Sequence, residues 1–275
     1  MDVRSLSPTE AKVILSLEAE GRDTVSLSEI QRRAEVSPGF ARKLAHGLIR
    51  KGWLQRVHRS VYLLSPSQFG PEALPDTDPL RLGSRLIVPY YFGFATAAEL
   101  HGLLPQASHV YYLVTTSRPP VGKLLNGRFR FIRLSERRFF GAHVIQRRNE
   151  ELRVSDLERT VLDCLSRPDF SGGMAGVSHI LAIAKPDLNW GRLGSYLDRY
   201  GNRSLELRTG YLVEHVRPSV RPPAGWLTRR LARQRDPFVP LGPPKAHGRT
   251  GSRNDRWHII QNVSDAELFA EGEIR

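Results

Sequence analysis

Cysteine and long apolar runs are nearly absent from this sequence. Cys164 is alone among 275 residues, so an intrachain disulfide and a zinc site made of several cysteines are excluded. No apolar run approaches about 18 residues, the length that crosses a bilayer, and the first residues lack a secretory signal pattern. We therefore expect a soluble, cytoplasmic protein with no membrane partner, in which Cys164 is a small buried residue.

Acidic residues are few and unevenly placed. The chain has 41 Lys and Arg against 28 Asp and Glu, a net charge of +13 and a pI of about 10.4, which favours a polyanionic partner. No acid occurs between Glu35 and Glu72. A cationic surface without carboxylates is what contact with phosphates requires. The cations of this interval are Arg42, Lys43, Arg50, Lys51, Arg56 and Arg59.

The basic interval begins with the signals of a helix. Ser37 can cap the helix, Pro38 suits its first position, and Gly52 ends it. At 100° per residue, apolar and cationic side chains fall on opposite sides. The residues predicted to pack are Phe40, Ala41, Leu44, Ala45, Leu48 and Ile49, and those predicted on the other side are Gly39, Arg42, Lys43, His46 and Arg50.

Elements on both sides of this helix complete a recognisable order. Residues 7–10 form a capping box that opens a first helix, and Ser28 with Gln31 opens a second, short one. Residues 53–57 and 61–64, rich in branched and aromatic side chains, predict a hairpin. A basic amphipathic helix alone is often only a solvated face, but this order is that of a winged helix-turn-helix.

We therefore predict that residues 1–64 bind double-stranded DNA. The first turns of a recognition helix usually reach base edges, and cations of the helix and wing meet phosphates. The predicted DNA-binding residues are Gly39, Arg42, Lys43, His46, Arg50, Lys51, Arg56, His58 and Arg59.

The remaining chain divides into a linker and a second domain. Residues 65–80 are punctuated by proline and predict a linker. In residues 81–275, strand signals come first, at 110–114, 129–134 and 143–146, and helices follow. This order predicts an α+β domain with a small, mostly antiparallel sheet.

Residues 217–256 are rich in arginine, proline and glycine, and residues 257–260 predict a strand docked on the domain. Two interpretations of the basic segment compete: a flexible tail with no ordered role, or a second phosphate-facing surface. The candidates for a second DNA surface are Arg217, Arg221, Arg229, Arg230 and Arg233.

A cluster of acids is the strongest candidate for catalysis in this sequence. Carboxylates of this kind can hold Mg²⁺, but two of them fit the capping box and first turn of a helix. We predict no catalytic residue, no metal and no cofactor, with a DNA-processing enzyme as the alternative to test. The acids are Glu150, Glu151, Asp156, Glu158 and Asp163.

Six segments carry a family resemblance. They are residues 57–62, 89–91, 95–103, 154–165 with Pro168 and Gly172-Gly173, 210–214 and 256–262. Residues 154–165, containing Glu-Arg-Thr-Val-Leu-Asp, are the most specific. In these segments the chain resembles the AbiEi-type antitoxins of type IV toxin–antitoxin and abortive-infection phage-defence loci. The resemblance implies a winged helix that binds inverted repeats in its own promoter and represses the operon.

The resemblance further implies a C-terminal domain that counters a nucleotidyltransferase-like toxin without needing a stable complex. The alternative is a stand-alone transcriptional repressor, or another DNA-associated protein, without a toxin partner. A neighbouring gene for a nucleotidyltransferase would favour the first.

Overall fold

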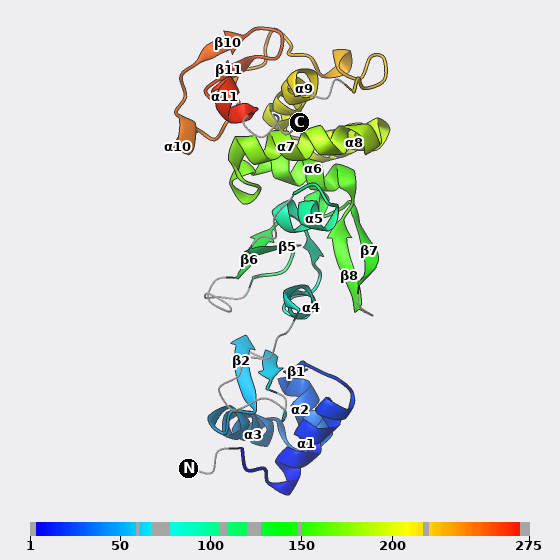
Figure 1. The fold of residues 1–275 in the computed structure, drawn as a ribbon, viewed down its shortest axis with the longest axis vertical. Coiled ribbons are helices and arrows are strands. Elements are labelled where there is room, and N and C mark those ends of the chain that lie inside the picture. The colour runs from blue at the N-terminus through cyan, green and yellow to red at the C-terminus, as the bar shows by residue number, and fades with distance from the viewer. Residues whose placement is uncertain are drawn as a thin grey trace. The chain divides into compact units, whose positions relative to one another are not determined.

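The chain forms two compact units (Figure 1). The first comprises Met1–Val88 and Ser117–Phe129, and the second Pro89–Thr116 and Arg130–Arg275. The first unit therefore extends beyond the boundary predicted at residue 64, and much of the predicted linker lies outside the described residues. The computed structural model describes residues 4–58, 61–65, 67, 78–104, 109–119, 128–147, 150–216 and 220–269.

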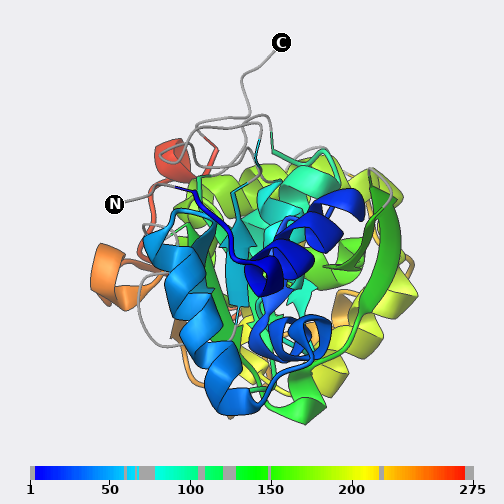
Figure 2. The ribbon, with the colours of Figure 1, turned by 90° about the horizontal axis from the view of Figure 1, so that it is seen from below.

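The first unit has the predicted winged helix-turn-helix order, with α2 and α3 as the helix pair and β2–β3 as the wing. Its antiparallel sheet has the strand order β1-β3-β2. Seen from below, its three longest helices face the viewer, with α3 at the left (Figure 2). The elements are α1 (Pro8–Ala19), β1 (Thr24–Ser26), α2 (Leu27–Ala34), α3 (Pro38–Arg50), β2 (Leu54–His58), β3 (Val61–Leu64) and α4 (Pro79–Ser84).

Side-chain caps fix where these helices begin. Ser7 forms the predicted capping box with Glu10 at the start of α1. The cap of α2 is Ser26, which pairs with Glu29, so the prediction of Ser28 as the cap was wrong. Strand β1 was not predicted, because three residues give no alternating pattern; its pairing with β3, where Val25 lies opposite Tyr62, stabilises it.

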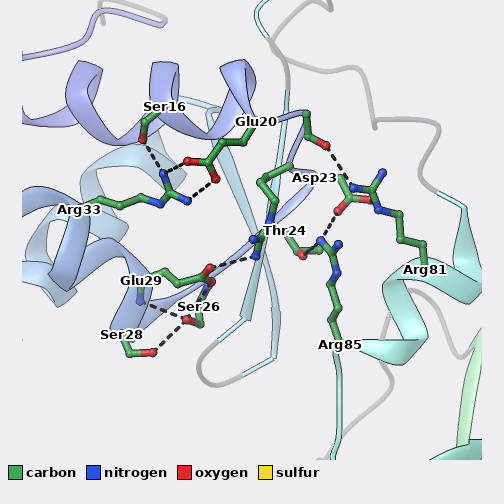
Figure 3. A network of polar contacts seen from close by, with 12 residues as sticks. Ser16, Glu20, Asp23, Thr24, Ser26, Ser28, Glu29, Arg33, Arg81 and Arg85 are labelled. Atoms are coloured by element: carbon green, nitrogen blue, oxygen red, sulfur yellow. Dashed lines mark hydrogen bonds and ion pairs between the residues drawn. The ribbon is translucent and has the colours of Figure 1, made fainter. Parts of the chain in front are cut away.

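Helix α4 is held to the first unit by two arginines (Figure 3). Arg85 donates hydrogen bonds to Asp23 at 2.9 Å and to Thr24 at 2.8 Å. Arg81 binds the carbonyl of Gly21 and lies 3.3 Å from the Asp23 carboxylate. These contacts explain why the segment after the predicted linker belongs to the first unit.

The second unit confirms the predicted α+β fold. Its larger sheet has the order β6-β5-β4-β8-β7, in which β4 and β8 are parallel, whereas β4–β5 and β7–β8 are antiparallel. Its elements begin with β4 (Tyr91–Phe92), α5 (Phe94–Leu100), β5 (Tyr111–Thr115), β6 (Phe129–Arg133), β7 (Ala142–Arg147), β8 (Glu150–Ser155), α6 (Leu157–Ser166), α7 (Gly173–Ala184), α8 (Trp190–Tyr200) and α9 (Arg203–His215). The short elements β9 (Val239–Pro240), α10 (Pro244–His247), β10 (Ser252–Asn254), β11 (Ile259–Gln261) and α11 (Asp265–Leu268) follow.

The acids weighed as a magnesium site have separate structural partners. Asp156 is the N-cap of α6 and accepts from the backbone N–H of Arg159 and the hydroxyl of Tyr196. Glu158 was predicted to complete a capping box, but its carboxylate accepts instead from the backbone N–H of Asn189 and from Arg192, so this prediction was wrong. Within the described residues, no three His, Cys, Asp or Glu side chains converge on a possible metal position.

Arg159 is the centre of a buried polar cluster. Its guanidinium is fully buried and lies 3.0 Å from Asp163 and 2.8 Å from the hydroxyl of Tyr91. The ring of Phe140 covers it at 4.4 Å from guanidinium to centroid, a cation–π contact. Cys164, on the same helix, is fully buried as predicted, and burial raises the pKa of its thiol to about 12.

Several residues of the C-terminal segment join the core of the second unit, and β11 contacts α9. Trp257 is fully buried, donates to Glu214 at 2.6 Å and lies so close to Gly210 that an added Cβ would sit 2.1 Å from its ring. Arg203 binds Asp236 at 2.7 Å and the carbonyl of Leu231 at 2.6 Å. None of the helices in the described ranges is both long and apolar enough to span a bilayer.

Candidate nucleic-acid interface

Helix α3 carries an exposed cationic face. Arg42, Lys43, His46 and Arg50 are all exposed, and a Cβ built at Gly39 would meet no atom within 4 Å. The opposite side packs into the core of the first unit, where each buried residue is 7% exposed or less. These buried residues are Ala41, Leu44, Ala45 and Leu48. The helix is therefore divided as predicted, apart from Phe40, whose side chain is exposed.

Among the described residues, no carboxylate forms an ion pair with this face. The six acids described between residues 4 and 65 are all engaged elsewhere, and some of these pairs appear in Figure 3. In the described part of the chain, Arg42, Lys43 and Arg50 form no ion pair. The partners of the acids are Lys51 for Glu10, the backbone of Ser67 for Glu18, Arg33 for Glu20, Arg81 and Arg85 for Asp23, Arg22 for Glu29 and Lys12 for Glu35.

Lys51, predicted as a DNA contact, also has a partner within the first unit. Its ammonium lies 2.6 Å from the carboxylate of Glu10, whose side chain is only 7% exposed. Burial alone would raise the pKa of Glu10, but the hydrogen bonds from Lys51 and Ser7 outweigh it, and the pKa is lowered. This pairing contributes stability above the ordinary value of 4.5, and the contribution is lost as the pH falls through the lowered pKa.

Truncating Lys51 should therefore mainly affect stability, whereas truncating Arg50 should mainly affect DNA binding. We expect Lys51→Ala to destabilise the protein by about 1–3 kcal/mol, because Glu10 is left buried without its partner. Arg50→Ala should leave stability nearly unchanged and reduce the salt dependence of DNA binding by about one unit of slope. Urea unfolding and binding titrations at several salt concentrations measure the two effects. Equal losses of DNA affinity in the two variants would contradict this assignment.

The wing contributes one described cation. Arg56 lies in β2 and is exposed, and a register shift in the pairing of β2 with β3 falls between Arg56 and His58. The side chain of His58 and all of Arg59 lie outside what the structure describes. The helix and wing thus bring Arg42, Lys43, His46, Arg50 and Arg56 into one unit.

The second basic segment is only partly exposed. Arg221, Arg229 and Arg233 are exposed, whereas Arg217 lies outside the described residues. Arg230 is 6% exposed; its guanidinium covers the ring of Trp226 at 4.4 Å and lies 3.6 Å from Asp198. Arg230 is therefore a packing residue, and its prediction as a DNA contact was wrong.

A comparison with protein families bears on the first unit. Residues 12–65 match the model of the AbiEi antitoxin, a transcriptional regulator. The AbiEi match spans α1 to β3 and includes every described residue of the cationic face. The family resemblance expected from the sequence is confirmed for this segment. No curated protein matches the sequence.

A solved structure is similar over nearly the whole chain. The crystal structure of the RV2827C protein from Mycobacterium tuberculosis aligns with a TM-score of 0.68 and 18% identity, covering 99% of this chain and 98% of that chain. At this identity the similarity shows the fold alone. The fold of the second unit, like that of the AbiEi-like first unit, therefore has a precedent in a solved structure.

Proposed function

We propose that this protein is a cytoplasmic, DNA-binding antitoxin that represses its own operon through the winged helix. The observation that carries the proposal is the uncompensated cationic face of α3, located within the segment that matches AbiEi transcriptional regulators. Double-stranded DNA with inverted repeats in the promoter is the proposed ligand. The proposed contacts are Gly39, Arg42, Lys43, His46, Arg50 and Arg56, with His58 and Arg59 of the wing.

The second unit would counter a nucleotidyltransferase-like toxin, as the resemblance of residues 154–165 to AbiEi-type antitoxins suggests. The proposal includes no catalytic step, since the carboxylates of this segment serve as a cap and as buried partners. Co-expression with the product of a neighbouring nucleotidyltransferase gene tests it: growth should be rescued by the full chain. If no such gene lies nearby, the stand-alone repressor becomes the better interpretation.

Salt dependence tests which cations meet phosphates. Five phosphate contacts, from Arg42, Lys43, Arg50, Arg56 and Arg59, should contribute about −4 to −5 to the slope of the logarithm of the binding constant against the logarithm of salt concentration. Contacts from the C-terminal arginines would add to this value. The measurement uses the full chain and the intergenic duplex upstream of its gene. A slope near zero would contradict phosphate contact by this face.

The exposed arginines of the C-terminal segment are proposed as a second DNA surface. Replacing Arg221, Arg229 and Arg233 by alanine should then reduce the slope by about three, because each contact releases about one counterion. An unchanged slope would restrict the DNA interface to the first unit.

A further inference from the structure

Phe40 is exposed on the recognition helix, although its spacing predicts a packed side chain. It is 48% exposed, whereas Ala41 and Leu44 beside it are buried. Burying an aromatic ring is favourable, and this ring is left largely in water within a unit that has a formed core. Single exposed apolar residues are common, so the exposure of Phe40 alone does not indicate a function, and the position of the ring must be considered as well.

Phe40 lies in the first turn of α3, three residues after the cap Ser37. At 100° per residue it is 60° from Lys43, so it borders the cationic face. The N-terminal residues of a recognition helix are those that contact base edges in the major groove. Gly39, next to it, leaves open space for a close approach. The aromatic ring therefore stands where base edges would be read.

The major-groove edge of DNA offers one apolar group to such a ring. Each base pair displays hydrogen-bond donors and acceptors, and thymine alone adds a C5-methyl group, which pairs with apolar side chains including Phe. We propose that Phe40 contacts a thymine methyl group and makes thymine a determinant of the recognised sequence. This inference rests on the proposed DNA-binding function and adds a base preference to it.

The test compares thymine with deoxyuridine, which pairs identically but lacks the methyl group. The probe is a duplex selected by the full-length protein from random duplexes, synthesised once with thymine and once with deoxyuridine throughout. The wild-type protein should bind the deoxyuridine duplex about fourfold more weakly for each contacted methyl. Phe40→Ala should bind both duplexes equally, at the affinity of the wild type for the deoxyuridine form.

Leu15 provides a matched control. It is another exposed apolar residue of the first unit, 55% exposed on α1, a helix that carries Glu18 and has Glu20 as its C-cap residue. Leu15→Ala should retain the full deoxyuridine penalty. Phe40→Leu, which keeps an apolar side chain, should retain part of it. Thermal unfolding of each variant confirms that the comparison is made between folded proteins.

Two results would overturn the inference. A full deoxyuridine penalty in Phe40→Ala, including the case in which its affinity for both duplexes falls by the same factor, would assign the methyl effect to DNA shape or to another residue. Failure of the wild type to select any duplex would remove DNA binding itself. If a duplex is selected but is absent from the upstream region, autorepression fails while the methyl contact is still tested.

Discussion

Replacing Arg42 and Arg50 together by glutamate is expected to weaken binding to promoter DNA by more than about a thousandfold. Each lost contact costs about 1–3 kcal/mol, and each new carboxylate is repelled by the phosphates that the arginine met. Both side chains are exposed and without an ion pair among the described residues, so folding should be preserved. An electrophoretic shift on the upstream intergenic fragment, at fixed salt, measures the effect.

A matched double variant separates this face from the charge of the whole protein. Arg137→Glu with Arg147→Glu changes the net charge equally, at two exposed positions of the second unit. It should bind the promoter nearly as well as the wild type. Supplied from a separate promoter, the Arg42 and Arg50 variant should still rescue growth from the toxin. Loss of rescue together with DNA binding in a folded protein would contradict the proposed division of labour.

Replacing Asp163 by alanine should destabilise the second unit by about 3–5 kcal/mol, because the guanidinium of Arg159 remains buried without its counter-charge. Both side chains are almost completely buried, at 0% and 1% exposed, so water does not screen the loss. Urea unfolding followed by tryptophan fluorescence measures it, since three of the four tryptophans, Trp190, Trp226 and Trp257, belong to this unit.

Two further variants test whether the destabilisation comes from leaving a charge buried without its partner, rather than from the loss of an ion pair as such. Arg159→Met with Asp163→Leu removes both charges and should be much less destabilised than the single variant. Glu35→Ala, which breaks a pair with 54% and 76% exposed side chains, should leave the unfolding midpoint nearly unchanged. A small effect of Asp163→Ala would mean that the aromatic rings around Arg159 are sufficient to hold its charge.

Helix α3 could be predicted because its signals are local. Ser37 and Pro38 fix its start, and the spacing of its apolar residues fixes which side packs. Phe40 escaped this reasoning because it lies at the edge of the apolar arc, where the helix angle alone does not decide between core and solvent. Whether a side chain in the first turn of α3 is buried depends on which neighbouring elements pack over it.

Tertiary partners account for the contacts that the sequence could not reveal. Lys51 follows Arg50 in sequence, but its partner Glu10 is 41 residues away, and no local pattern reveals that pairing. The guanidinium of Arg230 packs on the ring of Trp226 and pairs with Asp198, which lies on a separate helix. Short strands such as β1 were missed for the same reason, since their stability comes from pairing rather than from periodicity.

The burial of Trp257 has a genetic consequence. A nonsense codon at this position would remove residues 257–275, and with them the indole that packs against Gly210 and the strand β11. The truncated product would expose the apolar side of α9 and become a substrate for cellular proteases. Alleles that lose this short stretch should therefore behave as loss-of-function alleles of the whole second unit.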